Sequence, residues 1–477
     1  MKIAIICDVL GKENNGTTVA AMNLIRSLKA KGHEVRVVCP DEDRRGDEGF
    51  YIVKKINFGI FNDYVEENGV VISRPDEDML RTVIQGADVC HLVTPFFLAH
   101  KGMEIAREYG VPITASFHCQ AENISSHLFL MNSTRFNTKI YKTLYSYIYR
   151  YCTAVHYPTQ FICDVFEREC GHTTNHYVIS NGVGKEFVRH PEPKPAEFAD
   201  KKVVLFTGRY SREKCHKVLI DAVALTRDPG RIKLVFAGCG PLDEKLHEYA
   251  REVLPADDQP LFGFFSRPDM LRVLNYADLY VHPAEIEIEA IACLEAIKCG
   301  LVPVIADSPR SATRYFALGE KNLFKYDSPE ELASRIDYWL DDPEAMERCR
   351  RAYEGYSAQF DRDYAWTVWR ACSATPRQQN KYFAKQNISY GVSKYIISQY
   401  VYRLHVSADH ATVQERSFSW LFSQKKRNPP RLSGLSNSPT KKTTILPRGS
   451  AMPQPLTAAT AILTARRGSS RPSCFTA

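Results

Sequence analysis

Four carboxylates stand in an otherwise apolar run, EIEIEAIACLEAIKCG, at residues 285–300. An unpaired charge is costly to bury, so glutamates beside isoleucines and cysteines need partners. Glu287 and Glu295 are eight residues apart. If Glu287 ends a loop after a strand and Glu295 lies two turns into the next helix, both can face one cleft and accept hydrogen bonds from sugar hydroxyls. The alternative is a pair of glutamates that reach solvent at the edge of a buried helix.

Two cations follow a predicted strand in LFTGRYSREKCHK, at residues 205–217. Arg209 and Lys214 are five residues apart, just before a predicted helix. Positive charge at a strand end beside a helix N-terminus suits a diphosphate, whose two phosphates need neutralising. A solvated basic loop is the alternative, because charge runs usually face water.

Glycines in two other strand-to-helix loops could let the backbone approach a ligand. Gly16 and Thr17, in NNGTT, place bare backbone and a hydroxyl at a helix N-terminus, which favours anions. An ordinary turn with a threonine cap is the alternative. Gly238 and Gly240, in VFAGCGP, repeat the arrangement after another strand, although a lone G-x-G is common.

Short apolar, β-branched runs alternate with helical patterns along most of the chain. This alternation indicates parallel sheets covered by helices on both faces. The predicted fold is α/β, with two tandem Rossmann-like doubly wound domains and ligands at the carboxyl ends of the strands, in the cleft between the domains. Strands are predicted at residues 3–9, 34–39, 89–93, 112–118, 154–158, 203–207, 233–237, 279–282 and 303–306, and helices at 18–31, 99–109, 217–226, 289–298 and 330–340.

The alternation restarts after a stretch rich in Pro, Lys and Glu, RHPEPKPAEFADKK, which is typical of a linker. We therefore predict an N-terminal domain over residues 1–183, a linker over 184–201 and a C-terminal domain over 202–345. Further helices over 346–405 would partly cross back. The tail over 406–477 is rich in Ser, Thr, Pro and Arg and is expected to be disordered.

Charge is unevenly distributed over the 477 residues. The net charge is +7, but residues 416–477 carry +11 with no acid, so residues 1–415 carry −4. A mildly acidic body removes the main support for nucleic-acid binding. The 14 cysteines include no C-x-x-C pair and no zinc spacing, which favours buried thiols in a reducing cytosol and predicts no metal site. No window reaches the roughly 18 to 20 apolar residues that span a bilayer.

Taken in order, these motifs resemble those of the GT-B retaining glycosyltransferases of family 4, the glycosyl transferases group 1. The resemblance covers roughly residues 1–370. NGTTVAAMNLIRSLKAKGHEV is similar to the family's opening loop and helix, GRYSREK to its G-R-x-x-x-E-K turn, and AGCGP to its A-G-x-G-P. Glu287, Glu295, Ala296 and Gly300 match its E-x7-E followed by A-x-x-x-G.

The resemblance implies a hexosyltransferase whose C-terminal domain binds a nucleotide-sugar and needs neither metal nor another cofactor. Each candidate residue then receives a role. The diphosphate would be bound by Arg209 and Lys214 with Gly16 and Thr17, and the ribose and nucleotide by Glu295, Gly238 and Gly240. The donor sugar would be contacted by Glu287 and His118, with Glu289 as the second candidate. The family's usual E-G-F-G is Glu287-Ile288-Glu289-Ala290 here, a departure that changes how backbone amides approach the sugar.

Residues 123–163 contain no acidic residue but hold Arg135, Lys139, Lys142 and Arg150, interleaved with aromatic residues. A cationic, aromatic helix suits docking on an anionic membrane surface, and a packed helix with a solvated basic face is the alternative. Family members that glucosylate diacylglycerol dock in this way. The resemblance therefore implies a cytoplasmic enzyme, peripherally associated with the inner face of the membrane, that transfers glucose from UDP-glucose to 1,2-diacylglycerol with an α-linked product.

Other functions are consistent with the same residues. The acceptor could be a polysaccharide or a lipid-linked oligosaccharide. A non-catalytic nucleotide-sugar binding module would keep Arg209 and Lys214 but tolerate the loss of Glu287. An epimerase or a phosphorylase has the same fold, and a nucleic-acid binder would have to use the basic tail. The sequence predicts no oligomeric state.

Overall fold

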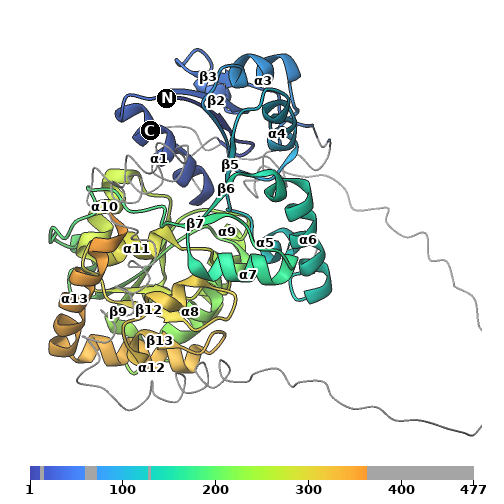
Figure 1. Cartoon of the computed structure of the whole chain (residues 1–477). Coiled ribbons are helices and arrows are strands. Elements are labelled where there is room, and N and C mark those ends of the chain that lie inside the picture. Colours follow the sequence, from blue (N-terminus) through green and yellow to red (C-terminus); the bar gives the residue numbers. More distant parts are fainter. Residues whose placement is uncertain (11–15, 58, 60–71, 127–129, 362–477) are drawn as a thin grey trace, which may run out of the picture. The chain divides into compact units, whose positions relative to one another are not determined.

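The computed structural model describes residues 1–10, 16–57, 59, 72–126 and 130–361 (Figure 1). The predictions for residues 362–405 and for the tail over 406–477 lie outside the described residues. So does the loop residue Asn15, which precedes Gly16.

Seven parallel strands form the first sheet, in the order β3-β2-β1-β4-β5-β6-β7. They are β1 (Lys2–Ile6), β2 (Glu34–Cys39), β3 (Phe50–Ile52), β4 (Val89–Leu92), β5 (Ile113–Ser116), β6 (Ala154–Tyr157) and β7 (His176–Val178). The winding changes direction between β1 and β4. In doubly wound folds, ligands bind beside such a switch point at the carboxyl ends of the strands.

Six parallel strands form the second sheet, in the order β10-β9-β8-β11-β12-β13. They are β8 (Lys202–Thr207), β9 (Ile232–Ala237), β10 (Leu261–Gly263), β11 (Leu279–His282), β12 (Pro303–Ala306) and β13 (Leu323–Phe324). Here the winding reverses between β8 and β11. The residues that follow these two strands are therefore placed next to each other.

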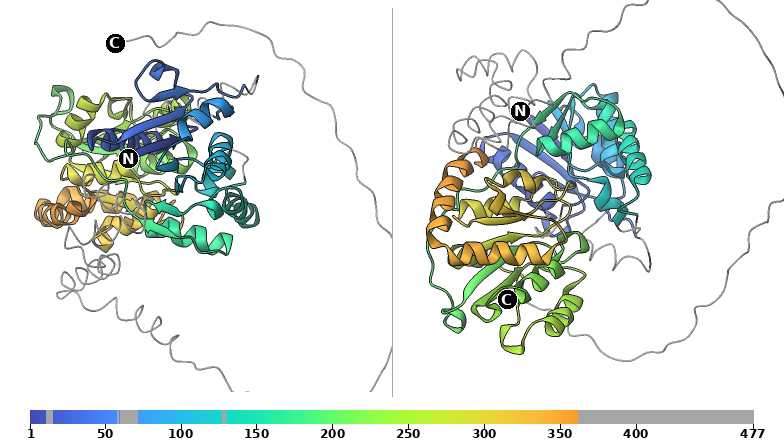
Figure 2. Two further views of the ribbon diagram at one scale, coloured as in Figure 1. Left: turned by 45° about the horizontal axis from the view of Figure 1, so that its top comes forward. Right: turned by 90° about the horizontal axis from the view of Figure 1, so that it is seen from below.

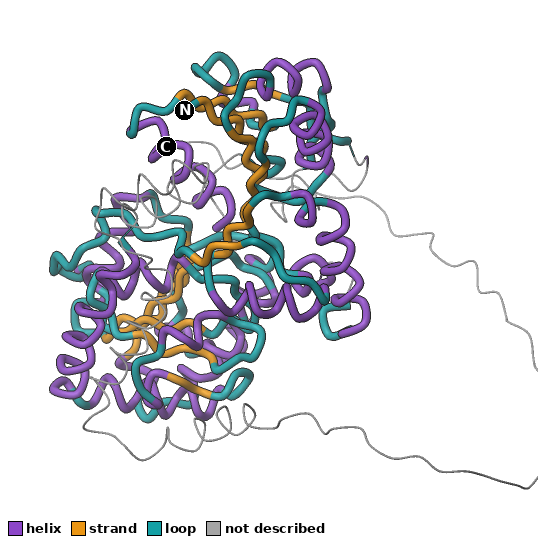
Figure 3. Tube along the Cα trace, in the orientation of Figure 1, coloured by secondary structure: helices purple, strands orange, loops and turns teal. Residues whose placement is uncertain are grey.

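Helices pack on both sheets, as the views in Figures 2 and 3 show. Those of the first half are α1 (Gly16–Ala30), α3 (Glu77–Ile84), α4 (Phe97–Glu108), α5 (Ala121–Ser126), α6 (Thr134–Tyr147) and α7 (Gln160–Cys170). Those of the second half are α8 (His216–Ala224), α9 (Asp243–Val253), α10 (Arg267–Tyr276), α11 (Ile291–Lys298), α12 (Pro329–Asp341) and α13 (Pro343–Ser357). After α13, the Phe360 carbonyl accepts a hydrogen bond from the Val183 N–H (2.8 Å), so the chain returns to the segment after β7.

Alternate residues of the central strands enter two cores, one on each face of the sheet. Ile5 and Ile6 are both fully buried but belong to different hydrophobic clusters. Leu205 and Phe206 of β8 divide in the same way. Burial on both faces explains why these strands are continuously apolar, as parallel sheets require.

The α/β prediction with two parallel doubly wound sheets is confirmed. All nine predicted strands are present, and those at residues 34–39, 279–282 and 303–306 have the predicted bounds. Two helix predictions need correction. The helix predicted from Glu289 begins at Ile291, and α6 ends at Tyr147, so Arg150 lies on a separate 3-10 turn. The boundaries at 183, 201 and 345 stay predictions; β7 ends at Val178 and β8 begins at Lys202.

His216, the first residue of α8, is a polar side chain inside an aromatic part of the second core. It is 2% exposed and packs edge-on against Phe206 and Tyr210. Neither ring nitrogen has a hydrogen-bond partner among the described residues. Burial lowers the pKa of His216 to about 3, so the ring is neutral and its two nitrogens are desolvated without compensation.

His216→Leu should therefore raise the free energy of unfolding, by about 1 to 2 kcal/mol, because the desolvated nitrogens are removed at similar side-chain volume. Urea unfolding monitored by fluorescence measures this change. His247→Leu is the matched control, since His247 is half-buried and its ring lies tilted against Phe262, with ring centroids 4.1 Å apart. A His216→Leu protein less stable than the wild type would contradict the interpretation.

Candidate active site

The loops after β8 and β9 pack directly on each other. Gly208 N–H donates to the Ala237 carbonyl and Tyr210 N–H to the Cys239 carbonyl, each at 3.0 Å. A Cβ on Gly238 would lie 2.0 Å from the Gly208 carbonyl oxygen, and one on Gly240 would lie 2.6 Å from that of Tyr210. The close approach that these two glycines allow is therefore to the neighbouring loop. Their contact with a nucleotide stays a prediction.

Lys214 and Glu287 meet although 73 residues separate them. Lys214 ends a 3-10 turn after β8, and Glu287 lies in the loop after β11, so the neighbouring positions of β8 and β11 bring them together. The Lys214 Nζ forms an ion pair with Glu287 Oε1, and the side chains are only 18% and 14% exposed. Two of the predicted site residues therefore form a single charged group.

A row of hydrogen bonds connects Glu287 to side chains of β11 and β8. His282 Nε2 lies 3.1 Å from Glu287 Oε1, His282 Nδ1 lies 3.1 Å from the Tyr280 hydroxyl, and that hydroxyl lies 3.0 Å from Thr207 Oγ1. An ionised carboxylate only accepts, so His282 Nε2 carries the proton and Nδ1 accepts from Tyr280. Thr207 then donates to Tyr280. The row fixes one tautomer of His282 and one position of Glu287.

The ionisation of Glu287 follows from these contacts. Burial alone would raise its pKa, but the positive charge of Lys214 and the hydrogen bond from His282 outweigh burial and lower the pKa to about 2. His282 is buried, which lowers its pKa, while Glu287 opposes that shift. At neutral pH the group is a carboxylate between an ammonium and a neutral imidazole.

Two further predicted site residues, Glu295 and Arg209, follow β11 and β8. Burial raises the pKa of the Tyr280 hydroxyl well above its ordinary value, and the charges of both Glu287 and Glu295 add to this rise. Glu295 lies in the second turn of α11 and is half-buried. Arg209 follows Gly208 and lies close enough to Cys239 to oppose the rise in the pKa of that thiol, which burial causes.

Glu289 lies apart from this group and contacts the first half of the chain. It is 4% exposed, and its carboxylate accepts from the Asn181 N–H (3.1 Å) and the Asn181 side-chain amide (2.5 Å). Burial raises the pKa of Glu289 to about 7 in spite of these hydrogen bonds. Its predicted contact with the donor sugar stays a prediction, and the observed partner is the segment after β7.

His118 follows β5, two residues before a contact with the second half of the chain. Its ring is half-buried and sits edge-on to His156, with the ring centroids 6.4 Å apart. Burial and the neighbouring His156 lower the pKa of His118 to about 3, so the ring is neutral. Two residues later, the Gln120 side-chain amide donates to the Arg310 carbonyl (3.0 Å). Gly16 and Thr17 open α1, with Gly16 exposed.

Sequence reasoning missed His282, Asn181 and Arg310 as site residues. Arg310 donates to the Asn132 side chain (2.7 Å) and to Glu285 (3.1 Å) and so joins the two halves beside Glu287. His282 had a signal, because it ends a predicted strand five residues before Glu287. Asn181 stands in ISNGV, which is similar to the family's N-G turn but gives no sign of a partner 108 residues away. Arg310 had no signal, since its role depends on a contact 178 residues away.

The predicted basic residues are exposed, whereas the aromatic residues between them pack inward. Arg135, Lys139, Lys142 and Arg150 are all exposed. Tyr141 and Tyr149 are buried, and Tyr147 stacks on His100 with ring centroids 3.7 Å apart. The surface of α6 is therefore cationic, and these three tyrosines anchor the helix to the first core. None of the helices in the described part of the chain has the length and apolar character needed to cross a bilayer.

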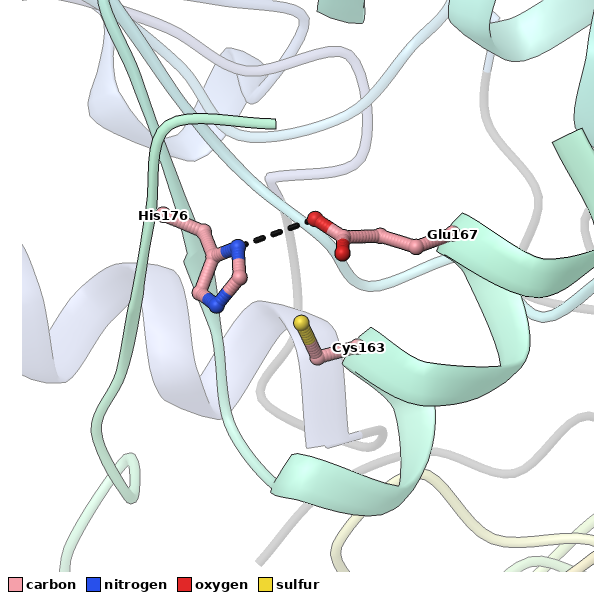
Figure 4. A group of neighbouring side chains, drawn as sticks. All are labelled: Cys163, Glu167 and His176. Carbon is pink, nitrogen blue, oxygen red and sulfur yellow. Dashed lines mark hydrogen bonds and ion pairs between the residues drawn. The ribbon is translucent and has the colours of Figure 1, made fainter. Parts of the chain in front are cut away.

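Cys163, Glu167 and His176 bring together three side chains of metal-binding type (Figure 4). Their ligand atoms lie within 4.8 Å of one another. The contacts they make are hydrogen bonds: Glu167 Oε1 accepts from the Thr174 N–H (2.7 Å) and hydroxyl (2.9 Å) and from His176 Nδ1 (2.9 Å). Glu167 Oε1 thus accepts from three donors, and the Cys163 thiol is only 1% exposed. The group stabilises the loop between α7 and β7.

Two family models match the chain: "Glycosyltransferase Family 4" over residues 14–187 and "Glycosyl transferases group 1" over residues 189–355. The chain is 25% identical over 371 residues to a GDP-mannose-dependent alpha-mannosyltransferase of Corynebacterium glutamicum, covering 74% of this chain and 84% of that protein. It is 23% identical over 321 residues to an alpha-monoglucosyldiacylglycerol synthase of Streptococcus pneumoniae, covering 64% and 71%.

Among solved structures, Anabaena Alr3699/HepE in complex with UDP and glucose superposes with a TM-score of 0.61 at 18% identity, covering 79% of this chain and 100% of that one. This likeness agrees with the two parallel-sheet halves. The two family models match the two halves in turn, and the matched segments include Lys214, Glu287 and Glu295. The chain therefore belongs to the GT-B glycosyltransferases described by these two families and is a hexosyltransferase.

Proposed function

We propose that the protein transfers glucose from UDP-glucose to 1,2-diacylglycerol at an anionic membrane surface, with an α-linked product. The observation that carries the proposal is the largely buried ion pair of Lys214 with Glu287 at the carboxyl ends of β8 and β11, with Glu295 on the helix that follows. A cation for phosphate beside carboxylates for hydroxyls is what a nucleotide-sugar requires.

In the proposed complex, Arg209 and Lys214 neutralise the diphosphate and stabilise the departing nucleotide, so that no metal is required. Glu287 and His118 hold the donor sugar, and Glu295 accepts from the ribose hydroxyls. UDP-glucose is supported by the solved complexes of Anabaena Alr3699/HepE with UDP and with UDP-glucose, and by the likeness to alpha-monoglucosyldiacylglycerol synthases. GDP-mannose is the second candidate donor, because the mannosyltransferase of Corynebacterium glutamicum is similar at 25% identity, against 23% and 21% for the two synthases.

A lipid acceptor is supported by the exposed cations Arg135, Lys139, Lys142 and Arg150 on and after α6. The sequence from 123 to 163 contains no acidic residue, and two acids from outside it, Glu169 and Glu122, contact α6 at Thr138 and Tyr141. We propose that this surface docks on anionic headgroups from the cytoplasmic side and brings the site to the membrane. The attraction is electrostatic, because Tyr141, Tyr147 and Tyr149 are engaged in packing.

Lys139→Gln with Lys142→Gln should weaken binding to anionic vesicles roughly 30-fold, since each lysine near such a surface is worth about 1 kcal/mol. Sedimentation with phosphatidylglycerol vesicles at low and high salt measures the change. Lys54→Gln with Lys55→Gln is the control, because these exposed lysines follow β3, at the opposite edge of the sheet from β6 and β7. Equal vesicle binding by both double variants would contradict the docking surface.

The test of the function is turnover of purified protein with a panel of nucleotide-sugars, with and without diacylglycerol vesicles. The proposal expects a glucosyl lipid from UDP-glucose and vesicles together. Transfer from GDP-mannose alone would select the second donor. Transfer only to a polysaccharide or a lipid-linked oligosaccharide would reject the diacylglycerol acceptor. Tight binding of UDP-glucose without any transfer would identify a binding module.

A further inference from the structure

The loop that carries Glu287 is held by the first half of the chain at its next two residues. Thr159 Oγ1 donates to the Ile288 carbonyl at 2.8 Å across 129 residues of sequence. Asn181 donates to the Glu289 carboxylate with its N–H and with its side-chain amide across 108 residues. Thr159 caps α7, and Asn181 lies just after β7, so both partners are fixed by the first sheet.

Glu289 cannot leave Asn181 without a cost. Its carboxylate is 4% exposed, and its hydrogen-bond donors are the Asn181 N–H, the Asn181 amide and the Ser180 hydroxyl. A buried carboxylate that loses such donors without reaching water is strongly unfavourable. Glu289 can therefore give up its hydrogen bonds to Asn181 only if water replaces them. This requires residues 288–289 and the segment after β7 to separate.

The backbone on both sides of Glu289 transmits this restraint to Glu287. The Glu287 carbonyl accepts from the Ala312 N–H at 2.8 Å. Ala290 is left-handed, with φ 61° and ψ 68°, immediately before α11. A non-glycine residue in that region costs about 1 to 2 kcal/mol, so surrounding contacts must hold it there. The segment 287–290 is thus fixed between Ala312 on one side and Asn181 and Thr159 on the other.

We propose that Glu289 is a positioning residue: its clamp on Asn181, together with the Thr159–Ile288 contact, places Glu287 for reaction only while the segment after β7 is docked on residues 288–289. These contacts connect the first half of the chain to the loop of Glu287, the residue proposed to face the donor sugar. They involve neither Arg209 nor Lys214. This rests on the proposed function for the role of Glu287. Nucleotide affinity should be independent of the clamp, and turnover should depend on it.

The experiment is a double-mutant cycle with Glu289→Ala, Asn181→Ala and both together, read by kcat, by the Kd of UDP and by urea unfolding. A misplacement of a reacting group by about 1 Å can cost about 100-fold in rate, so each single variant should lower kcat by about 30-fold. The Kd of UDP should change less than about 3-fold. Because the two residues act through one contact, the double variant should be no slower than the slower single variant.

Glu289→Gln supplies the conservative rescue. It keeps one oxygen for the Asn181 amide and should recover at least about 10-fold of the kcat lost in Glu289→Ala. Asp337→Ala is the matched control for destabilisation, since Asp337 is 6% exposed and accepts from the Arg227 N–H (3.1 Å) within the second half. It should lower the unfolding midpoint and leave kcat unchanged below that midpoint.

Each result decides the proposal. Wild-type kcat in Glu289→Ala, a parallel loss of kcat and UDP affinity, or additive effects of the two substitutions would overturn it. If Glu289→Ala does not fold, Asn181→Ala and Glu289→Gln carry the same comparison. If the wild type transfers no sugar at all, the proposed function fails, and the unfolding cycle alone still decides whether Glu289 and Asn181 are coupled.

Discussion

Lys214→Ala should abolish measurable binding of UDP-glucose, with a rise in Kd of at least about 100-fold, because charge-assisted contacts to phosphate are among the strongest in proteins. The loss has two parts. The ammonium that would neutralise the diphosphate is gone, and Glu287, 14% exposed, then presents an uncompensated negative charge to an anionic ligand. Titration calorimetry with UDP and UDP-glucose measures both parts.

The same substitution should destabilise the fold by about 3 kcal/mol, since it leaves one member of a largely buried pair alone. In the wild type, the pKa of Glu287 lies at about 2, below the ordinary 4.5, so its stabilising contribution is complete above pH 4.5 and is lost as the pH falls toward 2. Without Lys214, burial acts with less opposition and the pKa rises. The stability difference between the variant and the wild type should therefore shrink below about pH 4.

Two comparisons separate binding from stability. Lys214→Met with Glu287→Gln removes both charges and should recover most of the stability without recovering UDP binding. Lys217→Ala, three residues further along and exposed over the Tyr249 ring, should change neither. UDP affinity unchanged in Lys214→Ala would exclude Lys214 from the diphosphate site.

Glu287→Gln should lower kcat by about 100- to 1,000-fold, the range found when a positioned electrostatic group is removed from an active site. The amide has the same shape and can still accept from His282 Nε2, so the loop and the row of hydrogen bonds to Thr207 should survive. What disappears is the negative charge beside the reacting sugar. The Kd of UDP should not rise, because UDP lacks the sugar that Glu287 would contact and its phosphates no longer compete with Glu287 for Lys214.

Glu285→Gln is the matched control for Glu287→Gln. It alters a carboxylate two residues earlier that pairs with Arg310 at 3.1 Å and is 18% exposed. A small loss of kcat in Glu285→Gln, together with a large loss in Glu287→Gln, would locate the chemistry at the part of the loop that contacts His282. Wild-type turnover in Glu287→Gln would remove Glu287 from the active site.

The interior of both sheets could be predicted from the sequence, because each buried strand is a run of four to six mostly apolar residues. The strands that escaped prediction are the edge strands β3, β7, β10 and β13, which are two or three residues long. So short a run has no recognisable period, and it becomes a strand only because a neighbour offers hydrogen bonds.

Some features of the candidate site could likewise be predicted from the sequence, and others could not. The sequence predicted Lys214 and Glu287 as residues of one nucleotide-sugar site. It did not predict their ion pair, which depends on β8 and β11 being neighbours in the second sheet. Nor did it predict the location of Glu289, because Ala290 adopts a left-handed backbone that local sequence disfavours for alanine, and this starts α11 two residues later than predicted. Contacts such as Asn181 with Glu289 depend on tertiary structure alone.

The ion pair between Lys214 and Glu287 means that the ligand-free enzyme supplies its own counter-ion. In the proposed complex, an incoming phosphate would compete for the same ammonium, and its binding would release a carboxylate at the moment when a sugar arrives beside it. Departure of the spent nucleotide would be assisted in the reverse sense, because the released lysine has an internal partner to return to. The lysine would then exchange one anion for another in each cycle.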